Sequence, residues 1–129
     1  MQSYTMIVGI GIDMIEVERV RRKIEKEKGF REHIFSSMEI AYCNEQAEPY
    51  QHYAARFAAK EAFLKAIGRG LSFSYSVQNI EILPDQAGKP TIKLNEEYLQ
   101  LAEEGEWREI HVSLSHLKEI ASAVVIIEL

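Results

Sequence analysis

Cysteine is nearly absent from this sequence, and both long hydrophobic runs and an N-terminal targeting pattern are missing. The single cysteine, Cys43, has no second thiol with which to form an internal disulfide or a thiolate metal site. No apolar run approaches the roughly 20 residues of a membrane span, and the N-terminus lacks the basic region and cleavage site of a signal peptide. We therefore expect a cytoplasmic protein without a membrane partner.

Basic residues are also in short supply. The 15 Lys and Arg residues are outnumbered by 20 Asp and Glu residues, which gives a formal net charge of −5. Nucleic-acid-binding domains usually present a basic surface, so we expect no nucleic-acid partner. An acidic partner of any kind would need a local basic patch on this protein.

The remaining composition is that of an ordinary globular protein, with 129 residues, 47% of them hydrophobic and 27% charged. Apolar periodicity predicts both strands and helices, with Asn95 expected to cap the last helix. The predicted helices cover residues 16–28, 30–46 (as one or two helices), 54–68 and 95–104, and the predicted strands cover residues 6–15, 77–83, 89–94, 109–116 and 121–128. No repeat or linker divides the chain, so we expect one α+β domain over residues 1–129, with residues 1–5 as a flexible leader.

The helix predicted over residues 54–68 carries cations on its apolar side. At 100° per residue, Arg56 and Lys60 share one arc with five apolar side chains, and Glu61 lies at its edge. Those five are Tyr53, Phe57, Phe63, Leu64 and Ile67. Because burying an unpaired charge is costly, the arc indicates a cavity with an anionic occupant. Alternatively, both cations extend to solvent, and Glu61 and Lys65, four residues apart, form an ordinary surface pair.

Asp13 lies near the end of the first predicted strand, on the same face as Gly9 and Gly11. Glycine in a strand often marks a place where a ligand or another backbone comes close. The pattern therefore fits a metal or phosphate site beside the Asp13 carboxylate. The alternative is that Asp13 only ends the strand and starts the next helix.

The helix predicted over residues 16–28 carries Arg19, Arg22 and Lys26 at positions i, i+3 and i+7. This spacing places the three cations in one row on one helix face. The row either binds an acidic helix of a partner or is simply a solvated face.

The histidines and a glycine-rich loop give weaker signals. His33 and His52 have polar neighbours and no second ligand at metal spacing, so we interpret both as surface residues. His116 ends the apolar face of its strand, where it either contacts a phosphate or simply ends the strand. The loop from Gly68 to Ser76 follows the cation-bearing helix, and its backbone amides could bind phosphate although no full Walker sequence is present.

Three separate segments resemble, in order and spacing, the signatures of the holo-acyl-carrier-protein synthase family, the small bacterial-type branch of the phosphopantetheinyl transferases. The segments are Val8-Gly9-Ile10-Gly11-Ile12-Asp13, Arg56-Phe57-Ala58-Ala59-Lys60-Glu61-Ala62-Phe63-Leu64-Lys65-Ala66-Ile67-Gly68 and Ser113-Leu114-Ser115-His116. The resemblance extends from about residue 6 to residue 128. It departs from the family in a longer leader and in Leu114, where Ile is common. It implies an antiparallel sheet packed against a long central helix and shorter helices.

The resemblance also implies an activity: transfer of the phosphopantetheine arm of coenzyme A to a serine of apo acyl carrier protein, with release of adenosine 3',5'-bisphosphate. It implies Mg²⁺ bound by Asp13 and Glu61, whose hard oxygens suit this ion. Lys65 would neutralise the transferred phosphoryl group. The remaining phosphates would be contacted by Arg56, Lys60, Lys65, Gly68 and His116. Either Glu61 or a metal-bound water would accept the serine proton.

Two other classes of function stay open. One is a non-catalytic module that binds nucleotide phosphates, although the paired carboxylates Asp13 and Glu61 would repel a phosphate without a metal between them. The other is an adaptor that uses its basic helix. For the enzyme, we expect Arg19, Arg22 and Lys26 to bind the acidic carrier protein. We also expect a homotrimer with an active site at each subunit interface, partly because 129 residues give a small core.

Overall fold

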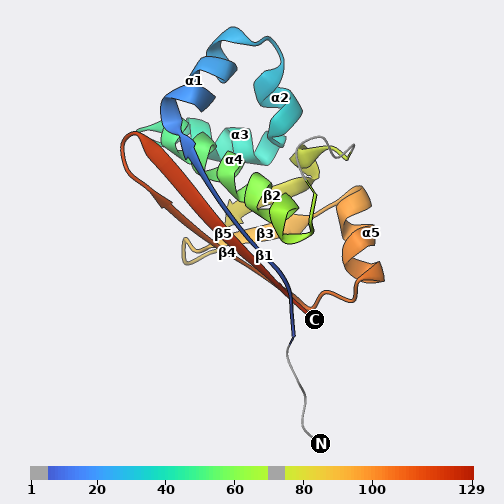
Figure 1. The fold of residues 1–129 in the computed structure, drawn as a ribbon. Coiled ribbons are helices and arrows are strands. Elements are labelled where there is room, and N and C mark those ends of the chain that lie inside the picture. The colour runs from blue at the N-terminus through green and yellow to red at the C-terminus, as the bar shows by residue number, and fades with distance from the viewer. Residues whose placement is uncertain (1–5, 70–74) are drawn as a thin grey trace, which may run out of the picture.

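Helix α4 (Pro49–Ala66) crosses one face of a three-stranded antiparallel sheet in the computed structural model, which describes residues 6–69 and 75–129 (Figure 1). The other elements are β1 (Ile7–Glu16), α1 (Val17–Lys26), α2 (Phe30–Ile34), α3 (Ser37–Asn44), the 3-10 turn η1 (Val77–Asn79), β2 (Ile80–Pro84), β3 (Pro90–Leu94), α5 (Glu96–Glu104), β4 (Glu109–His116) and β5 (Ile120–Glu128). The predicted leader, residues 1–5, and part of the predicted glycine-rich loop, residues 70–74, lie outside the described ranges. The predicted α+β architecture is confirmed.

The register of the three-stranded sheet shows which face of the sheet Asp13 and His116 occupy. Strand β5 lies between β1 and β4. Asp13 on β1 pairs with Ala123 on β5, and His116 on β4 pairs with Ala121. Both alanines are buried, so their positions face α4. Asp13 and His116 therefore lie on the helix-covered face of the sheet, on strands at its opposite edges.

Gly9 and Gly11 allow α4 to approach β1 directly. A Cβ atom added to Gly9 would lie 1.8 Å from the carbonyl oxygen of Ala66, and one added to Gly11 would lie 1.7 Å from that of Ala62. The close approach predicted at these glycines is therefore that of another backbone. The alternative in which Asp13 starts the next helix is wrong, because β1 continues through Glu16.

Helix α4 is buried around almost its whole circumference. It begins at Pro49, five residues before the predicted start, since proline suits the first turn of a helix. Every residue from Tyr53 to Lys60 is buried. The predicted restriction of the core-facing side to one arc is therefore wrong, and small alanines let elements pack on all sides of the helix.

The outer face of β1 is apolar and exposed. Ile10, Ile12 and Met14 are 59%, 64% and 68% exposed, although a lone apolar strand face would normally be covered. In Figure 1 the helices gather on the other side of the sheet. No helix in the described ranges is both long enough and apolar enough to cross a membrane.

Two local predictions differ from the structure. The strand expected from Val77 begins only at Ile80, because residues Val77–Asn79 form a 3-10 turn. Asn95 holds the N-cap position of α5, but its side chain donates to Glu81 Oε1 at 2.8 Å instead of capping the helix. Glu81 is buried and needs this donor.

Candidate active site

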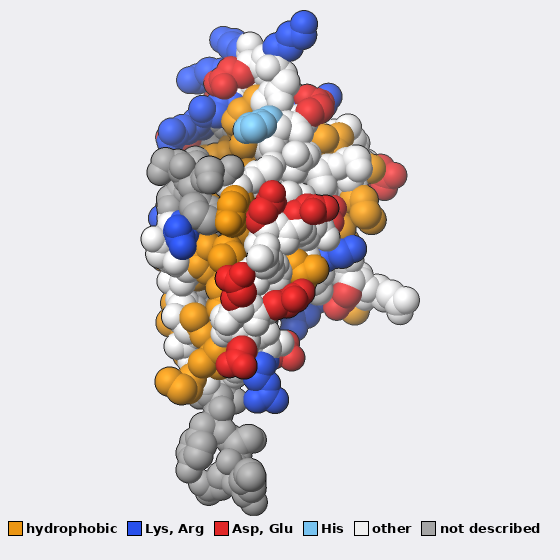
Figure 2. Space-filling view, turned by 90° about the vertical axis from the view of Figure 1, so that its right-hand side faces the viewer, with side chains coloured by type: hydrophobic (Ala, Val, Ile, Leu, Met, Phe, Trp, Pro, Cys, Tyr) orange, Lys and Arg blue, Asp and Glu red, His pale blue; other side chains and the backbone are white. Residues whose placement is uncertain are grey.

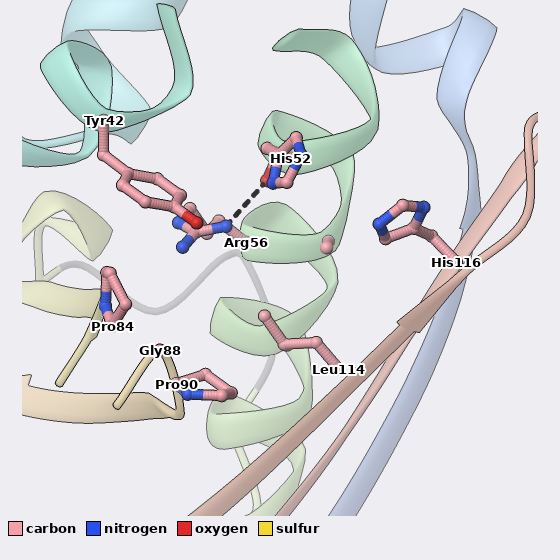
Figure 3. Close-up of a pocket in the computed structure, with 9 residues that line it drawn as sticks. Tyr42, His52, Arg56, Pro84, Gly88, Pro90, Leu114 and His116 are labelled. Atoms are coloured by element: carbon pink, nitrogen blue, oxygen red, sulfur yellow. Dashed lines mark hydrogen bonds between the residues drawn. The ribbon is translucent and has the colours of Figure 1, made fainter. Parts of the chain in front are cut away.

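Two pockets border α4, and each contains residues that the sequence analysis singled out. The first, which we call the carboxylate pocket, has a volume of about 170 Å³ and is lined by Asp13, Met14, Ile15, Arg19, Lys23, Phe57 and Glu61. The second, which we call the histidine pocket, has a volume of about 180 Å³ and is lined by Tyr42, His52, Ala55, Arg56, Pro84, Gly88, Pro90, Leu114 and His116 (Figure 3).

The carboxylate pocket joins the end of β1 to the middle of α4. Lys65 Nζ donates to Asp13 Oδ1 at 3.0 Å and to the Ile12 carbonyl at 3.0 Å. The alternative in which Glu61 and Lys65 form an ordinary surface pair is therefore wrong. The glycine contact between β1 and α4 brings the Asp13 carboxylate close enough to compete successfully for the lysine.

Glu61 is left with an unsatisfied oxygen. Its Oε1 atom is buried and has no hydrogen-bond partner. Burial raises the pKa of Glu61, and the neighbouring Asp13 charge raises it further, while Lys65 partly offsets the shift. A buried carboxylate oxygen of this kind is stabilised by a cation or by protonation.

These two carboxylates fit Mg²⁺. The ion prefers hard oxygen ligands and is usually held by one or two protein carboxylates, with phosphate and water oxygens completing its shell. Within the described ranges, no cluster of three or more His, Cys, Asp or Glu residues could hold a metal ion. A pair of carboxylates with one unpartnered oxygen suits a metal whose other ligands come from a substrate.

The histidine pocket contains a cation with unused donors. Arg56 lies with its guanidinium carbon 4.4 Å from the Tyr42 ring centroid. Its Nε donates to the Ile82 carbonyl at 3.0 Å, and Nη1 donates to the His52 carbonyl at 3.4 Å. Of its five N–H donors, the described residues therefore engage only these two. The predicted cavity with a cationic wall is present around Arg56.

The interpretation of His52 as a surface residue is wrong, whereas His33 is exposed as predicted. His52 is half-buried, and its ring centroid lies 5.5 Å from that of His116. Burial, Arg56 and His116 together lower the pKa of His52. The sequence did contain a signal: His52 stands one helical turn before Arg56 and so shares its side of the helix.

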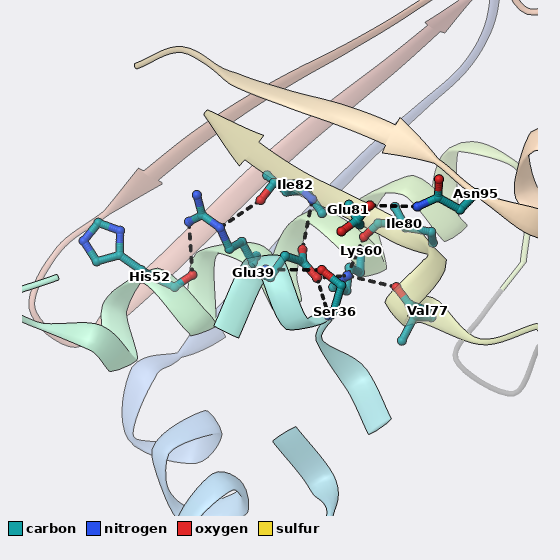
Figure 4. Close-up of polar contacts among 10 residues, drawn as sticks. Ser36, Glu39, His52, Lys60, Val77, Ile80, Glu81, Ile82 and Asn95 are labelled. Carbon is teal, nitrogen blue, oxygen red and sulfur yellow. Dashed lines mark hydrogen bonds and ion pairs between the residues drawn. The ribbon is translucent and has the colours of Figure 1, made fainter. Parts of the chain in front are cut away.

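The prediction that Lys60 contacts a phosphate is also wrong, because its ammonium group is enclosed in the protein (Figure 4). Lys60 is 1% exposed, and Nζ donates to Glu39 Oε1 at 2.8 Å, to the Val77 carbonyl at 2.9 Å and to the Ile80 carbonyl. An ammonium group has three donors, so none is left for a ligand. Glu39 also accepts the Ile82 amide at 2.9 Å. The Lys60–Glu39 pair therefore ties α3 and α4 to β2.

Gly68 ends the central helix. Its φ angle is 76°, in the left-handed region that glycine favours, and its amide donates to the Lys65 carbonyl at 3.0 Å. The Gly68 amide is therefore not available to a phosphate, contrary to the prediction. The following residues, 70–74, lie outside the described ranges.

The predicted basic row lies on exposed positions of α1. No salt bridge joins Arg19, Arg22 or Lys26 to a carboxylate within the described part of the chain, whereas Arg21 pairs with Glu18 at 2.9 Å. Arg19 also lines the carboxylate pocket. Figure 2 shows acidic side chains gathered over the middle and lower part of one face and basic side chains at its upper end, where Figure 1 places α1 and α2.

The two pockets lie on different sides of α4. Arg56 and Glu61 are five residues apart, so their directions from the helix axis differ by about 140° at 100° per residue. Phe57 and Glu61 face β1 and α1, whereas His52 and Arg56 face the β2–β3 hairpin and β4. The prediction of one arc lining one cavity is wrong, because both sides of this buried helix carry a site.

Comparison with known proteins identifies the family. The profile of the 4'-phosphopantetheinyl transferase superfamily matches residues 9–125. The holo-[acyl-carrier-protein] synthase of Cytophaga hutchinsonii is 47% identical over 123 residues, which cover 94% of this chain and 97% of that protein.

Solved structures of holo-[acyl-carrier-protein] synthases have a similar fold. The crystal structure of holo-[acyl-carrier-protein] synthase from Neisseria meningitidis matches with a TM-score of 0.85 at 32% identity, covering 95% of this chain and 98% of that one. The enzyme from Bacillus anthracis, solved in complex with CoA (3',5'-ADP), matches with a TM-score of 0.77 at 37% identity, covering 95% and 97%. Over nearly its whole length, and across both pockets, the chain belongs to the 4'-phosphopantetheinyl transferase superfamily.

Proposed function

We propose that this chain transfers the phosphopantetheine arm of coenzyme A to a serine of an apo acyl carrier protein and releases adenosine 3',5'-bisphosphate. The observation that carries the proposal is the carboxylate pocket, where Glu61 has a buried, unpartnered oxygen beside Asp13 and Lys65. Family membership supports the same activity. The relatives that match are named for this synthase reaction, and one of them was solved with CoA.

Asp13 and Glu61 would hold Mg²⁺, which would withdraw charge from the pyrophosphate of coenzyme A and stabilise the leaving bisphosphate. Lys65, which pairs with Asp13, would neutralise the transferred phosphoryl group. Either Glu61 or a metal-bound water would accept the serine proton. A nucleotide-binding module without chemistry would not need two carboxylates beside a phosphate.

The histidine pocket would bind the second phosphate of coenzyme A, the monoester on the ribose. The unused N–H donors of Arg56 suit a phosphate, and His116 lies at the same pocket. The pyrophosphate and this monoester are joined by only a few bonds. A helix with its side chains is about 10–12 Å across. The pyrophosphate and the monoester of one coenzyme A therefore cannot occupy the two pockets of the same chain.

A second copy of the chain could supply the histidine pocket that faces the carboxylate pocket of the first. We propose a homotrimer in which the carboxylate pocket of one subunit faces the histidine pocket of the next. The exposed apolar face of β1, which includes Ile10, Ile12 and Met14, offers the contact area that such an assembly needs. Light scattering should give the mass of three chains, and a fully active monomer at low concentration would contradict the proposal.

The transfer itself is tested by incubating the protein with coenzyme A, Mg²⁺ and an apo acyl carrier protein. Mass spectrometry should show the carrier protein gaining one phosphopantetheine arm, and a chelator should abolish the gain. A carrier protein whose acceptor serine is replaced by alanine is the control. An unmodified carrier protein in the presence of Mg²⁺ would refute the proposed function.

A further inference from the structure

The histidine pocket is lined by two imidazole rings, those of His52 and His116. The proposed function gives a role in phosphate binding only to His116. His52 comes from the second turn of α4 and His116 from the end of β4. Their ring centroids lie 5.5 Å apart with an interplanar angle of 62°, and both side chains line the pocket (Figure 3). Two elements far apart in sequence thus place two imidazole rings at the same opening.

Arg56 lies one helical turn after His52 and lines the same pocket. Its Nη1 donates to the His52 carbonyl, and its guanidinium group stacks on Tyr42, whose ring also contacts that of His52 at 5.9 Å. His52 is therefore held between an aromatic ring and a second histidine. The guanidinium group and the two imidazoles face one small space of about 180 Å³.

We propose that His52 is a specificity-determining residue, which binds the ribose phosphate monoester together with Arg56 and His116 and couples that binding to proton uptake. The inference rests on the proposed function and adds to it a residue that selects coenzyme A over its form without the ribose phosphate. In the proposed trimer, the pyrophosphate of the same coenzyme A is bound by the carboxylate pocket of the neighbouring subunit, so the role proposed for His52 is selection of the substrate.

The proton coupling follows from the surroundings of His52. The ionisable groups that face it are Arg56 on its own helix, His116 on β4 and Tyr42 on α3. Burial lowers the pKa of His52, and Arg56 and His116 lower it further, so the neutral ring is favoured before a ligand binds. A bound phosphate dianion reverses the local potential and favours the imidazolium. Affinity for the monoester should therefore weaken as the pH rises from about 6 to about 8.

Substrate discrimination tests the assignment. The ratio of kcat/KM for coenzyme A to kcat/KM for dephospho-coenzyme A, which lacks the ribose phosphate, should fall about tenfold in His52→Phe, the scale of one lost charged hydrogen bond. Phenylalanine keeps the ring packing against His116 and Tyr42. His52→Arg should keep the ratio but lose its pH dependence. His33→Ala, at an exposed histidine of α2, is the matched control and should change neither.

A second measurement is independent of transfer. Calorimetric titration with adenosine 3',5'-bisphosphate, in buffers of different ionisation enthalpy, should show proton uptake on binding, and 5'-AMP should show less. His52→Gln should remove most of the difference while keeping the fold, as judged by thermal unfolding. An unchanged substrate ratio in His52→Phe, or equal proton uptake by the two nucleotides, would overturn the inference. A wild-type protein that binds the bisphosphate with proton uptake but transfers nothing would instead refute the proposed function alone.

Discussion

At the scale of single residues, the strongest prediction concerns the two carboxylates of the carboxylate pocket. Asp13→Ala or Glu61→Ala should lower Mg²⁺-dependent turnover by at least ~100-fold, the usual scale for losing a major electrostatic contact. Initial rates of carrier-protein modification measure the effect. Glu103→Ala, at an exposed carboxylate of α5, is the control and should leave the rate unchanged. Near-normal activity of either pocket variant in a chelator would show that the assigned roles are wrong.

Glu61 should also lower the stability of the metal-free protein. Burial, together with the neighbouring Asp13 charge, raises the pKa of Glu61 above the ordinary value of a glutamate. The stabilising contribution of a carboxyl with a raised pKa is present below the unfolded-state pKa and is lost as the pH rises through the folded-state pKa. At pH 7, Glu61→Gln should therefore raise Tm by roughly a few degrees, and the difference should vanish near pH 4.

Thermal unfolding with and without Mg²⁺ checks this second prediction. The ion should raise the Tm of the wild type, because it binds only the folded protein, and should have little effect on Glu61→Gln. A variant that is less stable than the wild type at pH 7 without Mg²⁺ would contradict the assignment of Glu61 as an unsatisfied buried carboxylate.

Lys60 should matter for stability and not for substrate binding. Lys60→Met leaves the Glu39 carboxylate buried without its cation, which should cost about 3–5 kcal/mol in the free energy of unfolding. Lys118→Met, at an exposed turn position, should change it by less than ~0.5 kcal/mol. Urea denaturation measures both. A KM for coenzyme A that rises while the unfolding free energy stays constant would restore the phosphate-binding role.

The sequence showed which of these residues are unusual, but it did not show what surrounds them in the folded protein. Asp13 and Arg56 were found because a carboxylate beside strand glycines and a cation in an apolar arc are unusual patterns. Lys60 satisfies the same rule as Arg56, but its partner Glu39 lies 21 residues away on another helix, and helical periodicity carries no information about that contact. His52 was missed because its burial comes from β4 and α3.

At the scale of elements, helix α1 is expected to recognise the carrier protein. Arg19→Glu and Arg22→Glu should raise the KM for the carrier protein several-fold and flatten its salt dependence, because exposed charges act on encounter and are screened within about 10 Å at 0.1 M salt. The KM for coenzyme A should barely change in Arg22→Glu, whereas Arg19 also lines the carboxylate pocket, so Arg19→Glu should raise that KM as well. Steady-state kinetics at two salt concentrations measure both constants.

Arg21 provides the matched control for this helix. It makes the same charge change on substitution, but it already pairs with Glu18 and Glu25 on another part of the helix surface. Arg21→Glu should therefore affect the carrier protein KM much less. Equal effects at Arg19, Arg21 and Arg22 would mean that only net charge matters, and equal losses for both substrates in Arg22→Glu would mean that α1 supports the nucleotide pocket instead.

Element boundaries were predictable where local chemistry sets them. Strand β4 was placed correctly at both ends, because apolar alternation from Glu109 to His116 is regular. The start of α4 was not, since its first turn depends on Pro49 and on packing against neighbouring elements rather than on its own apolar pattern. Alanine-rich helices buried on all sides give a weak periodic signal, which explains why one arc was predicted where two functional sides exist.

At the scale of the whole molecule, the proposed assembly predicts complementation between inactive variants. Asp13→Ala breaks only the carboxylate pocket, and His116→Ala breaks only the histidine pocket. Co-expressed in equal amounts, the two should form mixed trimers in which about a quarter of the sites combine two intact halves. Each variant expressed alone is the control. No recovery of activity in the mixture, with mixed trimers verified by mass, would place both halves of a site in one subunit.

The two-sided placement of functional residues on α4 has a genetic consequence. In the proposed trimer, each chain contributes to two different active sites, one through Glu61 and one through Arg56. A chain that is damaged on both sides of the helix but still folds would disable at least two of the three sites of any trimer that it enters. An allele that encodes such a chain would act dominantly over a wild-type copy, whereas an allele that prevents folding would be recessive.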